Sequence, residues 1–426
     1  MAGTSSPTYN GPPQSSSTVL DVQLPSSGTV TLRQVSAHAQ QHAAELLIAR
    51  ARANLGEAER EAASLLRYDP VVVLGLGTRG REGAAGLEVE VAVSQRFEFS
   101  GQRRARIEAA RQLQLTLAAA VEVAAWAVHA DVHLAFSTAQ LAQEELILAQ
   151  QRQTLAETLE AMAAKKVAEG EESGMALNLA KAEVAWSRNA CTRAEAKATA
   201  AYLSLARAAG VSDRALRPEG AAMPSSVFGD RAAWGLEDRG DSPQVARANA
   251  AVGLAEARVR VAQRNTRPAP TLGVRVAREG ASAQRGSPNP APIAVMGTVA
   301  LAIPAFRGGR GEVARRTAEA EVTRAERRVL LQELDTLVRV ASVHADASWR
   351  RSLRLQTDVV AIFDDSLEAL QSAYEAGEED FSSVARSMQR LWTVREQVLS
   401  VRAEYHVALA ELELLVGPIE PVAGVR

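Results

Sequence analysis

The sequence predicts a mainly α-helical protein with a small β part, built from two copies of one long helical hairpin. Residues 310–376 contain no proline and one glycine, so they are predicted to form one helix, on the order of 100 Å long. After a break at Gly377 the helical pattern resumes to residue 416, with apolar residues every three or four positions, as in a coiled coil. The same order occurs earlier in the chain at a constant offset, since 377 minus 170 and 417 minus 210 are both 207.

Composition excludes several classes of protein. The 426 residues include 48 basic and 50 acidic ones, a net charge of -2, so no nucleic-acid partner is predicted. Cys191 is the single cysteine, which excludes an intramolecular disulfide and a cysteine-based zinc cage. No phosphate-binding glycine loop, nucleophile-base pair or three-ligand metal cluster is visible. We therefore expect no enzyme activity, no cofactor and no metal site.

The N-terminal residues 1–27 are rich in serine, proline and glycine, and we expect them to be disordered. They lack the basic start, the apolar run and the small-residue cleavage site of a secretory signal. Nowhere does an unbroken run of 18 apolar residues occur, so no transmembrane helix is predicted.

The first repeat is predicted to span residues 28–210. Its elements in chain order are a helix at 31–66, strands at 71–79 and 87–99, a long helix at 102–169 and a return helix at 174–209. In the second strand Leu87, Val89, Val91 and Val93 alternate with small or charged residues, which predicts a sheet with one apolar face.

Residues 211–241 are predicted to be a linker, and residues 242–417 repeat the first pattern. The second repeat has a helix at 243–266, strands at 271–277 and 293–303, a long helix at 310–376 and a return helix at 381–416; a tail of residues 418–426 follows. The helices 174–209 and 31–66, stacked end to end, would equal one long helix in length. Each half can thus supply two parallel helical rows of equal length, one formed by a single long helix and the other by two shorter helices stacked end to end.

The four strands have the length that tilted strands need to cross a bilayer. Four strands cannot close a barrel, and an open sheet edge is not tolerated in lipid, so such a chain would have to oligomerise. A small soluble sheet capping a helical bundle would account for the same strands.

The sequence resembles the TolC family of trimeric outer-membrane efflux proteins over residues 30–418. The resemblance rests on motifs in a fixed order: Gly28 to Leu32, Gln95 to Arg104, Arg267 to Gly273, Ile303 to Phe306 with Gly308-Gly309, Tyr374 with Gly377, and Tyr405 to Gly417. The stretch Phe99-Ser-Gly-Gln-Arg-Arg104 is similar to the CzcC-like branch associated with heavy-metal export.

This resemblance implies a homotrimer with a 12-stranded transmembrane β-barrel in outer-membrane lipid and an α-helical tunnel in the periplasm. It implies the exit duct of a tripartite efflux pump, passively conducting substrates, metal cations among the candidates. The implied partners are a periplasmic adaptor (membrane fusion protein) and an inner-membrane pump of the RND type. The alternative is a soluble coiled-coil scaffold, favoured by the absence of a visible signal sequence.

The resemblance places the periplasmic entrance and the adaptor-docking surface at the two glycine turns. The residues concerned are Gly170, Glu171, Glu172, Tyr374, Gly377, Glu378, Glu379 and Asp380. Three copies of these carboxylates would make an acidic ring that favours cations, although a solvated polar turn has the same composition. Family members often carry aspartates shortly after the tip tyrosine as a constriction; here those positions are Ser383 and Arg386.

Two histidine pairs and an arginine cluster complete the candidates. His38 with His42, and His129 with His133, are spaced by four residues, so each pair could face one metal ion. Without a third ligand neither makes a good site, and we expect solvent-facing or packed histidines. Arg103, Arg104 and Arg106 could line a tunnel, but snorkelling at a barrel rim is the expected role.

Overall fold

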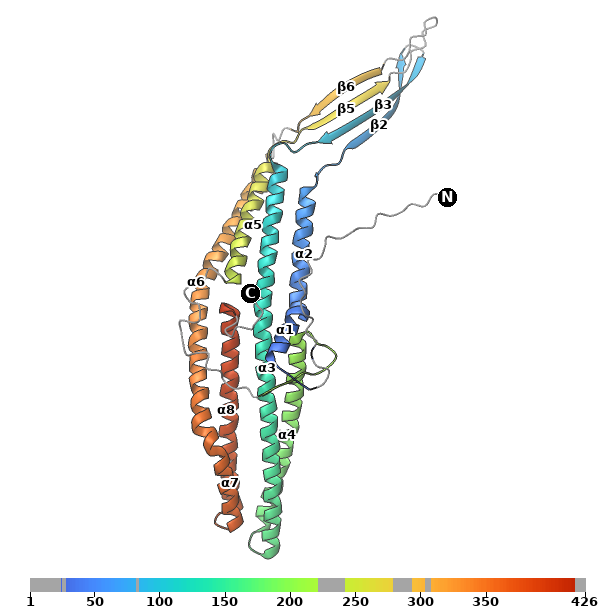
Figure 1. The fold of residues 1–426 in the computed structure, drawn as a ribbon. Helices are drawn as coiled ribbons and strands as arrows, with labels where there is room; N and C mark the ends of the chain where they lie inside the picture. Colours follow the sequence, from blue (N-terminus) through green and yellow to red (C-terminus); the bar gives the residue numbers. More distant parts are fainter. Residues whose placement is uncertain are drawn as a thin grey trace, which may run out of the picture.

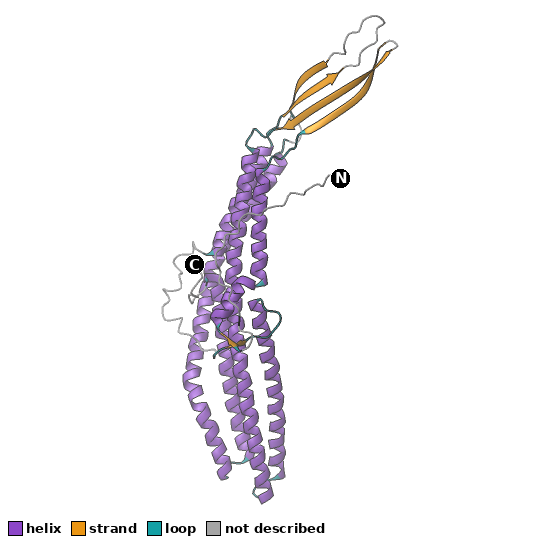
Figure 2. Ribbon diagram, turned by 45° about the vertical axis from the view of Figure 1, so that its right-hand side comes forward, coloured by secondary structure: helices purple, strands orange, loops and turns teal. Residues whose placement is uncertain are grey.

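The protein is an elongated molecule with a β-sheet at one end and a bundle of long helices at the other (Figures 1 and 2). The structure, a computed structural model, describes residue 24 and residues 28–81, 84–220, 242–278, 293–302 and 308–417. The predicted N-terminal disorder, apart from residue 24, most of the predicted linker and the tail lie outside these residues.

The first half contains four helices. They are α1 (Leu32–His42), α2 (Ala44–Ser64), α3 (Gln102–Glu169) and α4 (Gly174–Ala209). The single helix predicted at 31–66 is wrong, because Ala43 adopts an extended conformation and separates α1 from α2. The end of α4 packs into this break: a Cβ on Gly210 would lie 2.4 Å from the carbonyl oxygen of His42. In Figure 1 α4 and α2 follow one another along the same side of α3.

The second half contains α5 (Pro243–Asn265), α6 (Arg310–Leu355), the π-helical turn η4 (Gln356–Val360), α7 (Ala361–Ala376) and α8 (Phe381–Val416). The uninterrupted helix predicted at 310–376 is therefore wrong. The Thr357 hydroxyl has three acceptors at 3.1 Å, the carbonyl oxygens of Leu353 and Arg354 and the Oδ1 atom of Asp358. Such back-bonding competes with the regular helical ladder and bends helices, which accounts for the π turn.

A small parallel sheet lies beside the middle of the helical region. It pairs β1 (Thr29–Val30) with β4 (Arg217–Pro218). β4 lies within the segment predicted as a linker, so that prediction is wrong for its first residues. Pro218 is accommodated because it lies in a two-residue edge strand, where a missing N–H is tolerated.

The large sheet has the order β2-β3-β5-β6 and is antiparallel throughout. Its strands are β2 (Val71–Arg81), β3 (Ala84–Arg96), β5 (Thr271–Arg278) and β6 (Ile293–Ala300). The sequence predicts that β3 continues to residue 99 and β6 to residue 303. β3 ends instead at the pair Arg96 with Thr271, because the preceding Pro270 has no N–H to donate. β6 ends where Ala300 faces the first residue of β5.

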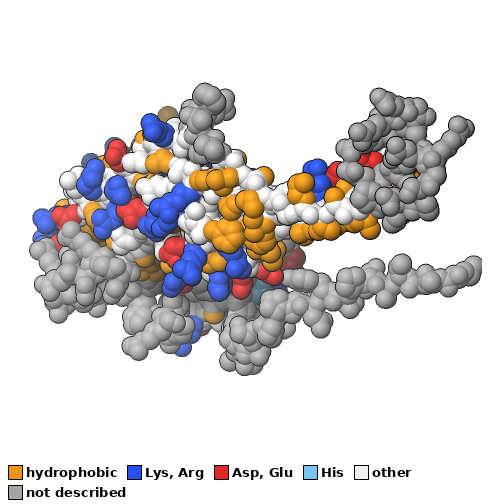
Figure 3. Space-filling model, turned by 90° about the horizontal axis from the view of Figure 1, so that it is seen from above, with side chains coloured by type: hydrophobic (Ala, Val, Ile, Leu, Met, Phe, Trp, Pro, Cys, Tyr) orange, Lys and Arg blue, Asp and Glu red, His pale blue; other side chains and the backbone are white. Residues whose placement is uncertain are grey.

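The register gathers most of the apolar side chains of the four strands on one face. One row across the sheet consists of Leu74, Val91, Val276 and Val295, which are 74%, 40%, 41% and 70% exposed. The opposite face is mostly small and polar apart from Val71, Val73 and Met296. It includes an ion pair in which Arg275 Nε lies 3.0 Å from Glu90 Oε1. Figure 3 shows hydrophobic side chains lining one side of the projecting sheet. The outer edges of β2 and β6 have no partner strand among the described residues.

The helical core is spread along the bundle. Separate clusters of buried residues lie around α1 and α4, at the lower tips, and between α6 and α8. α3 packs against α2, α4, α5 and α8 and so joins the two halves. By length and average composition α3 could also cross a membrane, and 22% of its most apolar 18-residue stretch is buried. No such helix is predicted from the sequence when an unbroken run of apolar residues is required. The mean hydropathy of an 18-residue stretch can be high even when the stretch contains one or two charged residues.

Candidate functional site

The two glycine turns, α3 to α4 and α7 to α8, have nearly identical backbones. Gly170 and Gly377 have φ angles of 79° and 78°, in the left-handed region that glycine adopts without steric cost. After each glycine the next N–H donates back to the helix, from Glu171 to Lys166 at 2.9 Å and from Glu378 to Ala373 at 3.0 Å. Both turns are therefore closed by the same helix-ending hydrogen bond.

Tyr374 connects the two tips. Its side chain is fully buried, and its hydroxyl donates to Glu172 Oε2 at 3.0 Å. Lys166 donates to the Tyr374 carbonyl oxygen, and its Nζ lies 4.6 Å from the centre of the tyrosine ring. Phe381 packs against the same ring edge-on, with centroids 5.9 Å apart. We call Lys166, Glu172 and Tyr374 the tip clasp, because it joins the first hairpin to the second.

The chemistry of the tip clasp keeps the tyrosine neutral. Burial, together with the hydrogen bond to Glu172 and the negative charge of that carboxylate, raises the pKa of Tyr374 well above its usual value. A neutral phenol can donate to the carboxylate at any physiological pH, so the contact does not depend on ionisation of Tyr374.

The five predicted carboxylates have different environments. Glu171, Glu378 and Glu379 are exposed, and none of them forms an ion pair within the described part of the chain. Glu172 is half-buried in the tip clasp. Asp380 caps α8, with its Oδ1 accepting from the Ser383 N–H at 2.7 Å.

The structure thus brings some predicted site residues together and separates others. Tyr374 and Glu172 are in contact, although 202 residues separate them. Ser383 is half-buried and bonded to the cap, whereas Arg386 is exposed. Lys166 is not among the site residues predicted from the sequence. A lysine in the last turn of a helix is common, because its positive charge interacts favourably with the helix dipole. Only its position four residues before Gly170 hints at a role in the turn.

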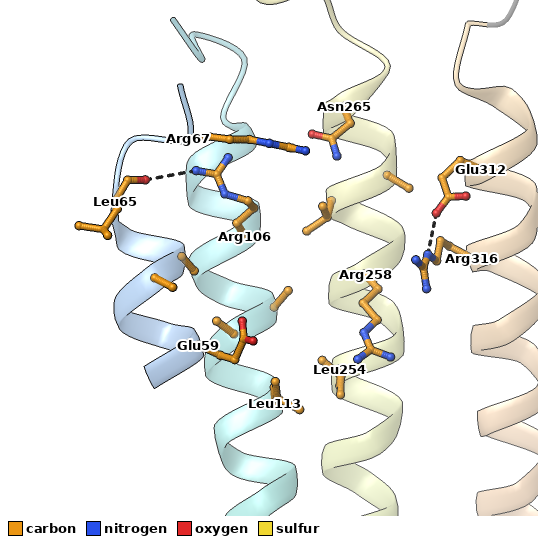
Figure 4. A pocket seen from close by; sticks show the side chains of 16 residues that line it. Glu59, Leu65, Arg67, Arg106, Leu113, Leu254, Arg258, Asn265, Glu312 and Arg316 are labelled. Atoms are coloured by element: carbon orange, nitrogen blue, oxygen red, sulfur yellow. Dashed lines mark hydrogen bonds and ion pairs between the residues drawn. The ribbon is translucent and has the colours of Figure 1, made fainter. Parts of the chain in front are cut away.

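A hollow of about 690 Å³ lies just below the sheet between α2, α3, α5 and α6 (Figure 4). Its arginines mostly bond within the chain. Arg106 donates to the Leu65 carbonyl oxygen at the end of α2 and pairs with Glu98, while Arg316 pairs with Glu312. Arg103 donates to the Ser64 carbonyl oxygen at 2.9 Å. The expected snorkelling is therefore wrong for Arg103 and Arg106, which satisfy the carbonyl groups that end α2.

Comparisons with known proteins agree with this architecture. Residues 237–418 match the family model described as outer membrane efflux protein. No curated protein matches the sequence.

Solved structures are similar over nearly the whole chain. The outer-membrane channel OprN is 16% identical with a TM-score of 0.71, and the alignment covers 91% of this chain and 89% of OprN. CusC is 14% identical with a TM-score of 0.72, covering 96% and 99%. VceC from Vibrio cholerae is 17% identical with a TM-score of 0.71, covering 91% and 96%.

OprN is described as an outer-membrane channel and CusC as a protein that forms a transmembrane channel. The matched family describes residues 237–418, and the shared fold extends to the first half. The resemblance predicted from the sequence is thus confirmed: residues 237–418 match the outer membrane efflux protein family, and the chain has the fold of the TolC-like channels OprN and CusC.

Proposed function

We propose that this protein is the exit duct of a tripartite efflux pump. Three chains would join their sheets into one 12-stranded barrel in the outer membrane, and their helices would form a tunnel through the periplasm. A periplasmic adaptor and an inner-membrane pump of the RND type would supply substrate and energy. The observation that carries the proposal is the large sheet, which has one apolar face and two open edges.

An apolar face that is exposed on every strand requires a nonpolar surrounding. The row from Leu74 to Val295 is continuous across four strands, as on the outside of a membrane barrel. The ion pair of Glu90 with Arg275 lies on the opposite face, which would line the water-filled interior. Edges of β2 and β6 from neighbouring chains would pair and remove the open edges, which lipid does not tolerate.

The helical region supports the same assembly. The apolar stretch of α3 is mostly half-buried in the single chain, so neighbouring chains could cover the part that is still accessible. At the far end, the tip clasp would hold the two hairpins of each chain together at the entrance, with Ser383 and Arg386 nearby as a candidate constriction. The exposed Glu171, Glu378 and Glu379 would form an acidic ring that favours cations, which is compatible with export of metal ions.

The sheet offers a direct test through neighbouring positions on opposite faces. Val91→Arg would place a charge on the lipid side and should destabilise the trimer by roughly 2 to 4 kcal/mol if it lies near the midplane. Ala92→Arg points to the interior face, where it lies opposite Arg275. Repulsion between the two arginines should cost about 1 kcal/mol at most, because water screens it, so the trimer should be destabilised much less than by Val91→Arg. The measurement is the heat-modifiable trimer in outer-membrane fractions. A soluble protein, or equal effects of the two arginines, would instead support the coiled-coil scaffold.

A further inference from the structure

One cluster of side chains has no part in the proposed duct. His129 and His133 lie one turn apart in the middle of α3, and both face Glu413 near the end of α8. Nδ1 of His133 lies 2.8 Å from Glu413 Oε2, and Nε2 of His129 lies 3.8 Å from Oε1. The sequence pattern offers two histidines without a third ligand; the fold supplies one that is 280 residues away from His133.

The three side chains are close enough to share one metal ion. One ligand atom from each of the three residues lies within 4.8 Å of the others, and this is the group with such spacing in the described part of the chain. Tetrahedral ligands about 2.1 Å from zinc are about 3.4 Å apart, between the two measured separations. Small side-chain rotations would therefore bring the three atoms to bonding distance.

Charge favours a cation at this place. Glu413 is 1% exposed, and a buried carboxylate is costly without a positive partner. Both carboxylate oxygens of Glu413 face α3, because they lie 2.9 and 2.8 Å from His133 Nδ1. The nearest arginine on α8, Arg402, is already engaged by Glu144 through two hydrogen bonds of 2.6 and 3.0 Å.

A fourth polar group faces the cluster. His406 is 8% exposed, both of its ring nitrogens lack a hydrogen-bond partner, and its ring centre lies 6.4 Å from that of His133. A buried imidazole without partners is costly unless something in the pocket bonds to it.

The backbone on both sides of Glu413 is fixed. Four residues later, Gly417 lies so close to α3 that an added Cβ would be 2.8 Å from the Trp126 ring. In the other direction, the ion pair of Arg402 with Glu144 ties α8 to α3. The ligands are thus held by two helices whose relative position is set elsewhere.

We propose that His129, His133 and Glu413 bind one divalent transition-metal ion of the zinc class. Two imidazoles and one carboxylate are ligands that zinc accepts, with a fourth position open to water or to His406. Such an ion would connect α3 of the first half to α8 of the second. It would be a resident structural ion, and the inference does not depend on which substrate the duct conducts.

The other histidine pair provides a matched control. His38 and His42 have the same spacing, but their Nδ1 atoms contact the carbonyl oxygens of Ala209 and His38, at 2.9 and 3.1 Å. Their rings are stacked with centroids 4.1 Å apart, and no carboxylate of the described residues joins them in a ligand group. Spacing by four residues is therefore present in both pairs, whereas the third ligand is present in one.

The test is a Co²⁺ titration of the full-length protein, purified in detergent without a histidine tag and stripped with a chelator. We expect visible absorption of bound Co²⁺ that saturates at one ion per chain and is displaced by Zn²⁺. Glu413→Gln keeps the shape of the side chain and should weaken binding by at least about 100-fold, because losing even an outer partner costs about 10 to 100-fold. The double variant His38→Gln with His42→Gln should bind as the wild type does.

Thermal melting followed by circular dichroism separates binding from folding. Zinc should raise the melting temperature of the wild type and of the His38/His42 variant, but not that of Glu413→Gln or His133→Gln. Absence of stoichiometric Co²⁺ binding to the wild type would overturn the proposal, whatever the variants do. Undiminished binding by Glu413→Gln, or loss of binding in the control variant, would overturn it as well.

Discussion

The two hairpins differ although they occupy equivalent places in the repeat. In the first, α3 runs for 68 residues without interruption. In the second, the corresponding length is divided into α6 with 46 residues, the five-residue turn η4 and α7 with 16 residues. Figure 1 shows α3 nearly straight, whereas α6 and α7 follow a bent path. The ascending arm of the first hairpin is thus one continuous helix, whereas that of the second is interrupted by a π turn.

The aromatic residues follow the same division. The buried cluster at the tips contains Phe363, Tyr374, Phe381 and Trp392, all from the second hairpin. At the offset of 207, the first hairpin has Val167 in place of Tyr374 and Ala185 in place of Trp392. The first hairpin contributes only aliphatic side chains to this cluster: Leu148, Leu159, Ala163, Ala176 and Ala180. The two hairpins have therefore diverged in the side chains that they bring to the tip.

The largest effect is expected from Tyr374→Ala. It removes a fully buried ring and the hydrogen bond to Glu172, and should lower the local free energy of opening at the tip by about 3 to 5 kcal/mol. Hydrogen exchange of the tip amides measures that energy, and single-channel conductance should rise as the tips separate. The equivalent Val167→Ala should cost about 1 kcal/mol. Equal losses at both positions would show that the hairpins do not differ in this way.

The features that depend only on residues close together in the chain could be predicted from the sequence. The glycine turns are visible from single residues, since a glycine between two proline-free helical patterns usually ends one helix before the next begins. The alternation around Val91 predicts one face of the sheet. The spacing of three or four that predicts the coiled-coil seam of α8 selects Leu391. Trp392 is the buried residue there, because α8 packs against α3 as well as against α6 and α7.

The remaining features depend on contacts between halves. Glu172 meets Tyr374 across 202 residues, and Glu413 meets His133 across 280. No spacing rule reports such pairs, because they arise only when two hairpins pack side by side. The π turn escapes sequence reasoning for another reason: a threonine inside a helix pattern is common, and nothing in the sequence shows that Thr357 bonds two carbonyl groups.

The two glycine turns should respond differently to valine. Strain at a positive φ costs on the order of 1 to 3 kcal/mol in both Gly170→Val and Gly377→Val. A Cβ at Gly170 meets no atom within 4 Å, whereas one at Gly377 lies 3.8 Å from Lys166 Nζ, so the longer valine branches would press on the tip clasp. We expect Gly377→Val to assemble but to lose efflux and disulfide crosslinking to an adaptor hairpin.

Asparagine controls for the strain itself, since it tolerates the left-handed conformation. Gly377→Asn should therefore regain most of the lost efflux. If Gly170→Val and Gly377→Val are indistinguishable, the clasp plays no part in docking; wild-type efflux in Gly377→Val would place docking elsewhere.

A substitution at Thr357 tests whether its hydrogen bonds produce the π turn. Thr357→Val keeps the volume of the side chain but removes the hydroxyl donor, so the turn should return to regular α-helix and rotate α7 by about 100° relative to α6. The change in stability should be on the order of 1 kcal/mol. Distances between spin labels on α6 and α7 would report the rotation.

α3 offers the control for this change. The Thr158 hydroxyl donates to one carbonyl oxygen, that of Thr154 at 2.9 Å, within a straight helix. Thr158→Val should leave the label distances in the first hairpin unchanged. A π turn that persists in Thr357→Val would assign the bend to packing against α8.

The smallest effect on stability is expected from the exposed carboxylates. Replacing Glu171, Glu378 and Glu379 with glutamine removes charges that contribute little to folding, because water screens them. If they form the acidic ring, cation-over-anion selectivity in single-channel recordings should fall while the trimer stays intact.

Glu172 and Asp380 separate this electrostatic effect from a structural one. Asp380→Asn keeps a side chain that can cap α8, and Glu172→Gln keeps an acceptor for the Tyr374 hydroxyl, so both preserve the tip contacts while removing charge. Because these two carboxylates are already engaged, their loss should change selectivity less than the loss of the three exposed ones. Equal selectivity in the triple variant and the wild type would mean that the carboxylates only solvate the turns, and that any preference for cations arises elsewhere in the duct.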